Sequence, residues 1–231
     1  MTVDIGIIGA MESEVEGLVA ALEGVREETA GSVKFFLGEA FGKRVAVTRC
    51  GVGKVFAALA AEAMIIKYSP KLIINTGVGG ALARGLNTTD VVIADKLVEH
   101  DMDTSPLGDP KGLISGINKI YFDADERSVS LLSEIAREKG INATVGTVAS
   151  GDKFIAKKED KDAIVREFSA SACEMEGGAI AHVAYVNSTP FAVIRAISDS
   201  ADGEATMDYP TFMPIAAKIS TELTLELIKK Y

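Results

Sequence analysis

The 231-residue sequence contains only two cysteines, two histidines and no tryptophan. Cys50 and Cys173 cannot build a disulfide framework, and neither belongs to a Cys/His cluster with the spacing of a metal site. A histidine-based catalytic triad would have only His100 and His182 available. The sequence therefore predicts neither a metal ion nor another cofactor.

Basic residues and long apolar runs are also scarce. Lys and Arg number 24 against 33 Asp and Glu, a formal net charge of −9, which disfavours nucleic acids and anionic membranes as partners. No stretch reaches the roughly 18 apolar residues of a membrane span, and the apolar segment Met1–Ala10 lacks the basic residues of a signal peptide. We therefore expect a cytoplasmic protein with reduced thiols.

Apolar residues make up 48% of the chain, enough for a large core, and short apolar runs alternate with helical patterns. This alternation predicts one α/β domain over residues 1–231, with a mostly parallel central sheet covered by helices on both faces. Residues 101–120 are expected to form a long loop. The expected strands are Val3–Gly9, Val33–Ala40, Arg44–Cys50, Leu72–Thr76, Asp90–Glu99, Asn142–Ser150 and Phe191–Ile197. The expected helices are Glu12–Leu22, Lys54–Tyr68, Glu126–Lys139, Lys157–Phe168, Glu176–Val186 and a C-terminal helix that buries Phe212, Ile215, Ile219, Leu223 and Leu227.

Two glycine-rich segments resemble known ligand-binding motifs but do not match them fully. Cys50–Lys54 lacks the first glycine and the final Ser or Thr of a phosphate-binding loop. Gly77–Gly80 lacks the third glycine of a dinucleotide-binding fingerprint, which would fall at Leu82. We interpret both as tight strand-to-helix turns, with close approach of the backbone to a ligand as the alternative.

Acidic residues gather where ligands bind in such folds, at the carboxyl ends of predicted strands. Glu14, Glu176 and Asp199 occupy three of these ends. Each alone has a structural explanation, as a helix-start residue that favours the macrodipole or as a cap. Together, carboxylates without metal ligands suit acid–base chemistry at a sugar centre, where one protonates the leaving group and another activates water.

Six segments resemble one family, in order and over nearly the whole chain. They are Ile7–Val15, Cys50–Val55, Ile73–Gly77, Ser150–Ile155, Glu174–Gly177 and Arg195–Asp202. Together they look like the bacterial 5′-methylthioadenosine/S-adenosylhomocysteine nucleosidases of the nucleoside phosphorylase superfamily. The resemblance implies a three-layer α/β/α sandwich with a central mixed sheet, and a nucleoside as the small-molecule partner.

The resemblance implies a role for each catalytic residue. Asp199 would be the general acid that protonates N7 of adenine, with Ser198 orienting it. Glu14 would hold and deprotonate the attacking water, while Glu12 is interpreted as a solvated residue at the helix start. Arg195 would support the water and Glu14, and a simple ion pair at the strand end is the alternative.

The same resemblance implies the substrate contacts. Glu176 would accept hydrogen bonds from the ribose hydroxyls, and Met175 would pack on the sugar. Phe154 would stack on adenine, Ile155 would bind the base edge through its backbone, and Gly80 would let the backbone approach the ligand.

A phosphorylase is the alternative enzyme, with phosphate in place of water as the nucleophile. Phosphorylase relatives commonly carry Arg and Ser where this sequence has Asn75 and Val78, and Glu12 and Glu14 would repel a phosphate. Hydrolysis is therefore favoured, although Val78 replaces the Ser with which many nucleosidases touch the water. A nucleoside-binding protein without turnover is the second alternative.

The end of the site that would bind the 5′ group is less defined. The family is dimeric, so a homodimer is expected, with Val52 lining the partner's pocket. Leu107, Leu113 and Ile114 would suit a thioether, and Phe212 either closes over this end or packs the helix start. Methylthioadenosine is the first expected substrate and S-adenosylhomocysteine the second, with 5′-deoxyadenosine and futalosine-type nucleosides left open.

Overall fold

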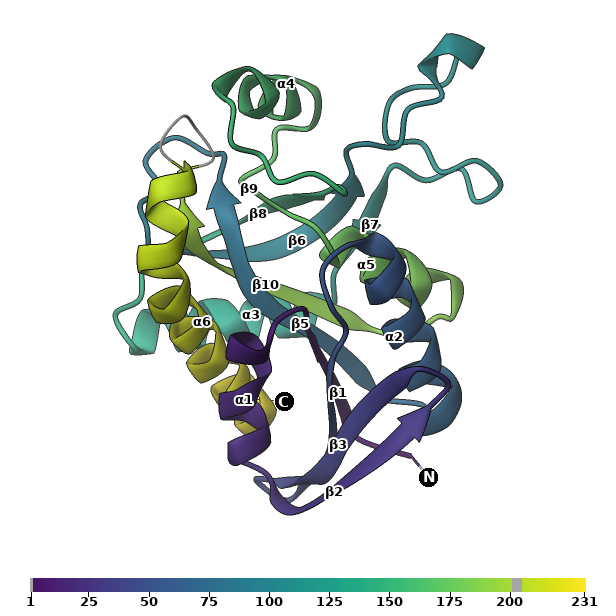
Figure 1. Ribbon diagram of the computed structural model, residues 1–231, viewed down its shortest axis with the longest axis vertical. Helices are drawn as coiled ribbons and strands as arrows, with labels where there is room; N and C mark the ends of the chain where they lie inside the picture. Colours follow the sequence, from purple (N-terminus) through teal and green to yellow (C-terminus); the bar gives the residue numbers. More distant parts are fainter. Residues whose placement is uncertain (1, 201–204) are drawn as a thin grey trace.

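The computed structural model describes residues 2–200 and 205–231 (Figure 1). The described residues form a ten-stranded sheet, with the strand order β10-β6-β8-β9-β5-β1-β4-β3-β2 and β7 paired to β6. The strands are β1 (Ile5–Gly9), β2 (Glu23–Ala30), β3 (Val33–Ala40), β4 (Lys43–Arg49), β5 (Leu72–Ala81), β6 (Val91–Glu99), β7 (Tyr121–Asp123), β8 (Ala143–Ser150), β9 (Ala172–Glu174) and β10 (Phe191–Asp199).

The sheet is mixed, as the family resemblance implied. β1 pairs in parallel with β4 and β5, and β10 pairs in parallel with β5, whereas the pairs β10–β6 and β5–β9 are antiparallel. The pairings β5–β10–β6–β8–β9–β5 close into a ring, and β1, β4, β3 and β2 extend from it. The carboxyl ends of β1, β5 and β10 therefore lie at one edge of neighbouring parallel strands.

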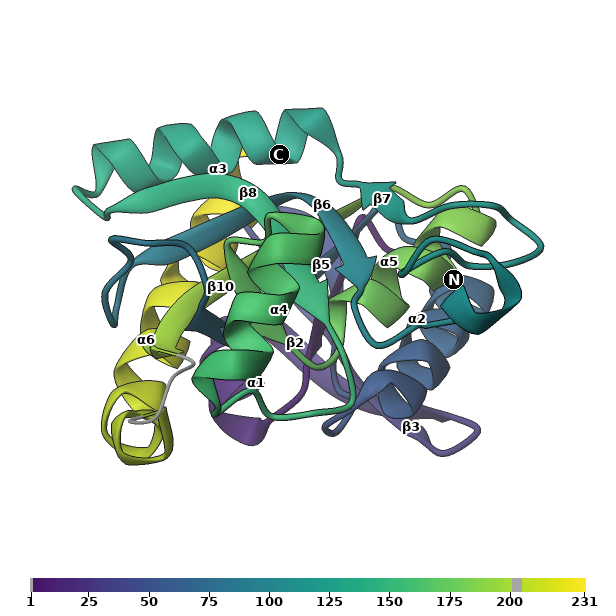
Figure 2. The ribbon, with the colours of Figure 1, turned by 90° about the horizontal axis from the view of Figure 1, so that it is seen from above.

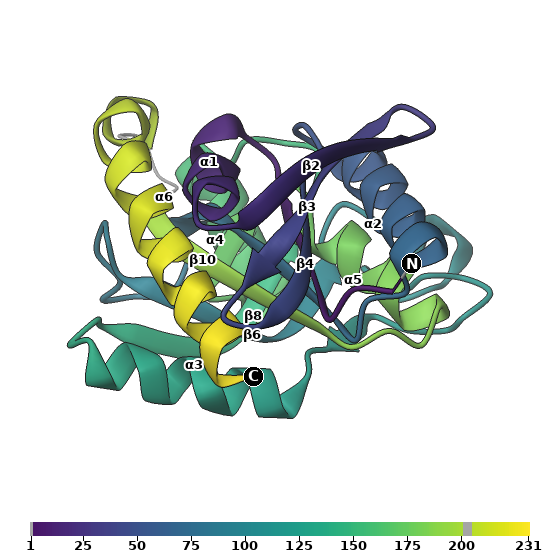
Figure 3. The same ribbon diagram turned by 90° about the horizontal axis from the view of Figure 1, so that it is seen from below.

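Helices cover both faces of the sheet and complete three layers. Helices α1, α3 and α6 pack on one face, whereas α2 and α5 pack on the other, and Figure 3 shows α1 and α6 across the strands from α2 and α5. Helix α4 covers one end of the sheet (Figure 2). The helices are α1 (Glu12–Ala20), α2 (Lys54–Tyr68), α3 (Glu126–Glu138), α4 (Lys158–Phe168), α5 (Gly177–Val186) and α6 (Ala205–Lys230), with a short 3-10 helix η1 (Ser105–Leu107). Among these elements, no helix is both long and apolar enough to cross a bilayer.

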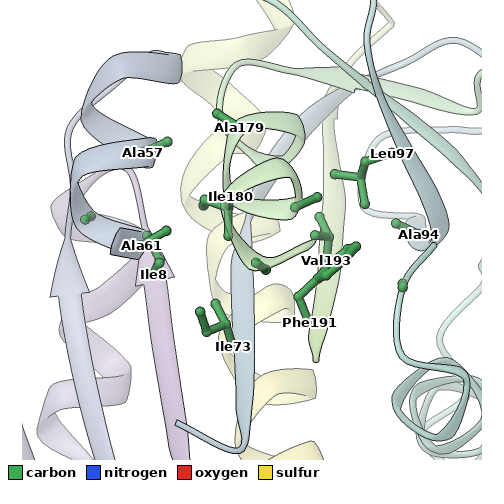
Figure 4. Packing of buried hydrophobic residues seen from close by; sticks show 14 of the residues in the cluster. Ile8, Ala57, Ala61, Ile73, Ala94, Leu97, Ala179, Ile180, Phe191 and Val193 are labelled. Atoms are coloured by element: carbon green, nitrogen blue, oxygen red, sulfur yellow. The ribbon is translucent and has the colours of Figure 1, made fainter. Parts of the chain in front are cut away.

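Alternate residues of the central strands supply the two cores. On β5, Ile73 joins the cluster beneath α2 and α5, whereas Ile74 joins the cluster beneath α1, α3 and α6. Val193 and Ile194 on β10 divide in the same way. Figure 4 shows the first cluster, in which small residues of the two helices approach the strand side chains. The continuous apolar runs in the sequence follow from this two-sided burial.

The strands expected at Val33–Ala40 and Arg44–Cys50 are present as β3 and β4, which pair antiparallel as a hairpin. The predicted turn at Gly77–Gly80 is wrong, because β5 continues in extended conformation to Ala81 and is buried throughout. A side chain at Gly77 would place Cβ 2.4 Å from Oε1 of Glu14, and one at Gly79 would lie 2.9 Å from the carbonyl oxygen of Cys173. These glycines therefore allow close approach rather than a turn.

Strand β2 was not predicted at all. Its segment Glu23–Ala30 is mainly charged and exposed, and it pairs only with β3, at the edge of the sheet. A charged edge strand lacks the apolar alternation by which strands are recognised, and its charges discourage pairing with another chain.

Helix α6 follows the predicted periodicity with one correction. Leu223 and Leu227 are buried, but Ile215 is 50% exposed. Polar residues take part in the buried face instead, since Ser220 donates or accepts a hydrogen bond with Thr76 over 2.5 Å and Thr224 donates to Thr76 over 2.9 Å. Hydrophobicity alone could not identify this polar seam between α6 and β5.

We expect Leu223→Ala to lower the free energy of unfolding by about 2–5 kcal/mol, because it removes buried methyl groups between α6 and the sheet. Ile215→Ala on the same helix should change it by no more than about 0.5 kcal/mol. Urea unfolding measures both values. Equal losses for the two variants would contradict the assigned packing face.

Candidate active site

A cavity opens at the shared edge of β1, β5 and β10. It collects side chains from segments far apart in the sequence, including both predicted catalytic carboxylates. Its lining consists of Ala10, Met11, Glu14, Val52, Val78, Gly79, Gly80, Lys153, Phe154, Ile155, Cys173, Glu174, Met175, Glu176, Ser198, Asp199 and Tyr209.

Glu14 lies in the first turn of α1, with its carboxylate turned back toward the end of β1. Its Oε2 accepts backbone N–H groups from Ala10 at 2.7 Å and Met11 at 2.9 Å, and its Oε1 accepts that of Val78 at 3.0 Å. The bond from Met11 is the reciprocal half of a capping box. Three amides from two strand ends thus fix the carboxylate, which is only 4% exposed.

Burial raises the pKa of Glu14, while the nearby charge of Arg195 and the three backbone N–H groups partly offset that rise. A carboxylate with a raised pKa is a stronger base than an exposed one, so this environment suits a group that takes a proton from water.

Glu176 caps the start of α5 and faces the same cavity. Its Oε1 accepts the backbone N–H of Gly53 at 2.8 Å, which ties it to the turn before α2. Burial and the neighbouring charge of Glu174 raise the pKa of Glu176 to about 7. The charge of this carboxylate therefore changes near neutral pH.

Glu174 lines the cavity and forms a buried ion pair with Arg195, and it is a site residue to which the sequence assigned no role. Oε2 of Glu174 also accepts the N–H of Glu176 at 3.0 Å and that of Gly177 at 2.7 Å. Burial would raise the pKa of Glu174, but Arg195 and the hydrogen-bond donors hold it below its usual range. The segment Glu174–Gly177 carries two carboxylates, and its resemblance to the family implied a role only for the second, Glu176.

Arg195 differs from its expected role. Its guanidinium donates to Glu174 and to Asn75, and it does not line the cavity. Its effect on Glu14 is electrostatic, through a charge that lowers the pKa of that carboxylate. The ion-pair alternative thus describes its contacts.

Aromatic and polar groups lie together at the end of β10. Oγ of Ser198 donates to Oδ2 of Asp199 at 2.9 Å, and both residues are buried. Phe154 meets Tyr209 edge to face, with ring centroids 5.7 Å apart. Tyr209 was missed, because no motif surrounds it and its distance in sequence from Phe154 gives no sign of the contact.

The predicted lining residues Val78, Gly80, Ile155 and Met175 are all present in the cavity. Val52 lines the cavity of its own chain, and its expected place in a partner's pocket stays a prediction. Phe212 is not among the lining residues; Tyr209, one turn earlier on α6, is.

The three residues expected to meet a thioether do not line this cavity. Leu107 is exposed in η1, on a segment that extends away from the sheet (Figure 1). Ile114 is buried in the core of its own chain, and Leu113 does not line the cavity either.

Comparison with known proteins agrees with this geometry. A family model described as the phosphorylase superfamily matches residues 4–229. The 5′-methylthioadenosine/S-adenosylhomocysteine nucleosidase of Actinobacillus succinogenes is 40% identical over 225 residues, covering 97% of each protein. The crystal structure of such a nucleosidase from Neisseria meningitidis, in complex with methylthio-immucillin-A, is 34% identical with a TM-score of 0.95, covering 98% of this chain and 99% of that one. The chain belongs to this nucleosidase family of the phosphorylase superfamily.

A related fold serves another substrate as well. The native structure of futalosine hydrolase from Helicobacter pylori is 34% identical with a TM-score of 0.94, covering 98% of this chain and 97% of that one. The superfamily name also includes phosphorylases, so the charges of the cavity matter. Among the described lining residues only Lys153 is cationic, and it pairs with Asp160 at 2.7 Å. A phosphate would instead meet several carboxylates, which disfavours it in this nucleosidase.

We expect kcat/KM to rise with pH through an apparent pKa near 7, because only ionised Glu176 accepts hydrogen bonds with both oxygens. Glu176→Gln should abolish this rise with pH. It should also lower kcat/KM by about tenfold or more, because the variant loses a charged hydrogen-bond acceptor. Initial rates of adenine release between about pH 5.5 and 8.5 measure the profile. Glu39→Gln, at an exposed position on β3, is the control. If kcat/KM of Glu176→Gln still rises with pH through the same pKa, the titrating group is another residue.

Proposed function

We propose that the protein hydrolyses the N-glycosidic bond of 5′-methylthioadenosine and S-adenosylhomocysteine, releasing adenine and the thioribose. The observation that carries this proposal is the presence of Glu14 and Asp199, two buried carboxyl groups, in one cavity beside Glu176. General acid–base catalysis at a sugar centre needs such a pair, since one group must give a proton while another takes one.

Asp199 is the proposed acid. Adenine is a poor leaving group as an anion, so a proton given to N7 lowers the barrier to its departure. The hydrogen bond from Ser198 to Oδ2 holds the carboxyl group in the cavity. Phe154 and Tyr209 offer the aromatic faces against which adenine stacks.

Glu14 is the proposed base. Its carboxylate is held by three amides and carries a raised pKa, so it can take the proton of a water that attacks the anomeric carbon. Val78 assists through its backbone N–H to Glu14, which does not depend on its side chain. A side-chain hydroxyl at this position is therefore not required to orient the base.

Glu176 is proposed to bind the ribose hydroxyls. Positive charge develops on the sugar as adenine leaves, and an ionised acceptor then binds its hydroxyls more strongly than in the ground state. Met175 lies next to it in the lining and supplies an apolar contact for the sugar. At the remaining end of the cavity, Met11 and Val52 suit a thioether.

The products formed from methylthioadenosine, with and without phosphate, test the function. We expect adenine and free methylthioribose in both conditions, at rates that do not depend on phosphate. Chromatography with mass detection identifies the sugar. Formation of the sugar 1-phosphate would instead show a phosphorylase, and binding without adenine release would show a nucleoside-binding protein.

Asp199→Asn provides the matched control for this measurement. It keeps size and shape but cannot donate the acid proton, so kcat should fall by about 10²–10⁴-fold while methylthioadenosine still binds. Isothermal titration calorimetry measures the binding. An unchanged kcat would remove Asp199 from the mechanism.

We further propose that the protein acts as a homodimer. An exposed apolar stripe begins beside the cavity at Val52, just before α2, and continues along the helix through Val55, Phe56, Leu59 and Ile66. These residues recur at helical spacing on one side of α2, a patch that an isolated chain would leave in water. A second copy is the proposed occupant because the stripe adjoins the cavity and Leu107, 84% exposed, extends on the 101–120 segment.

The cytoplasmic location expected from the sequence stays a prediction.

Leu59→Lys should convert the dimer to a monomer, because it places a charge in the middle of the apolar stripe. Ile215→Lys is the control, since Ile215 and Leu59 are each 50% exposed but lie on different helices. Sedimentation equilibrium measures both masses. A monomeric wild-type protein, or a dimer that survives Leu59→Lys, would contradict the assignment of this face.

A further inference from the structure

A second hollow continues from the proposed active site. The two cavities share Ala10, Met11 and Val52 in their linings. Beyond these residues, the hollow is lined by Glu12 at the start of α1, by Lys34 and Phe36 on β3, and by Arg49 at the end of β4, together with Ser32, Cys50 and Gly51. We call this hollow the charged groove.

The charged groove carries both signs of charge. Arg49 binds Glu12 at 2.8 Å, and both side chains are more than half exposed. Lys34 pairs with Glu27 at 2.8 Å and lies over the ring of Phe36, with Nζ 5.8 Å from its centroid. Two cations and one lining carboxylate thus surround a space that opens directly onto the active-site cavity.

The position of the groove relates it to one end of a nucleoside. Asp199 and Phe154 are assigned to the base, and Glu176 to the ribose hydroxyls. The part of the substrate left over is the 5′ substituent, for which Met11 and Val52 are the proposed apolar contacts. These are two of the residues that the cavity shares with the charged groove.

We propose that the charged groove binds the amino-acid tail of S-adenosylhomocysteine, an inference that rests on the proposed function. The α-carboxylate binds Arg49, with Lys34 close by, and the α-ammonium binds Glu12. Because the tail carries one charge of each sign, it can take both partners of the Arg49–Glu12 pair without leaving a charge unpaired. Methylthioadenosine ends in a methyl group and leaves the groove unused.

The test is the ratio of kcat/KM for S-adenosylhomocysteine to that for methylthioadenosine. Arg49→Met should lower this ratio about fivefold, as expected for one partly exposed charge contact. High salt should lower the wild-type ratio as well, since it screens exposed charges. Arg44→Met is the matched control, because Arg44 also lies on β4, is partly exposed and faces a carboxylate, Asp4, but lies outside the groove. Its ratio should stay at the wild-type value.

A substrate without the carboxylate sharpens the test. Cleavage of 5′-(3-aminopropylthio)-5′-deoxyadenosine, which keeps only the ammonium, should be unaffected by Arg49→Met and weakened by Glu12→Gln. An unchanged substrate ratio in Arg49→Met, or an equal loss for both natural substrates, would overturn the proposal. If the wild-type protein cleaves neither substrate, the proposed function fails. Calorimetry of S-adenosylhomocysteine binding then tests the groove separately. Weaker binding to Arg49→Met than to wild-type and Arg44→Met protein would support the proposal, and equal binding to all three would overturn it.

Discussion

The buried ion pair between Glu174 and Arg195 is the interaction on which the electrostatics of the site depend. Both side chains are 2% exposed, and removing charges from water costs on the order of several kcal/mol per ion unless each finds close partners. Glu174 gains these partners from Arg195, Ser150 and the N–H groups at the start of α5. Burial raises the pKa of both Glu176 and Glu14; the charge of Glu174 adds to the rise at Glu176, whereas the charge of Arg195 partly offsets the rise at Glu14. Removing Glu174 or Arg195 would leave the other charge buried without its partner. It would also change the pKa values of Glu176 and Glu14.

The sequence predicted the main site because parallel strands bring their carboxyl ends together. Glu14 and Asp199 each follow an expected strand, so their convergence required only the expected α/β fold, whereas the short strand β9 before Glu176 was not among the expected strands. The glycine-containing end of β5 allows these side chains to lie close together. The sequence predicted a turn in this segment, Gly77–Gly80. Gly77 leaves the space that the Glu14 carboxylate fills, and local sequence could not reveal a contact with a residue more than sixty positions away.

Other features depend on tertiary partners that a single sequence does not show. The charged strand β2 exists because β3 offers it an edge, since its own residues lack apolar alternation. Tyr209 faces the cavity because of how α6 docks on the sheet. The exposure of Ile215 has the same origin, because hydroxyl groups of α6 bind Thr76 and rotate the buried face away from the purely apolar stripe. The periodicity of apolar residues predicts that a helix is present. The way in which the helix packs on the sheet determines which of its side chains are buried.

The choice of water over phosphate follows from the backbone as much as from net charge. Amides at the ends of β1 and β5 point into one space, and such groups of N–H donors ordinarily attract anions. Glu14 fills that space with its own carboxylate and takes three of the donors. An incoming phosphate would have to displace a carboxylate held by the chain itself, with Glu176 beside it. A neutral water has no such conflict and can donate to the basic oxygen, so the carboxylate proposed to activate the water also disfavours a phosphate in its place.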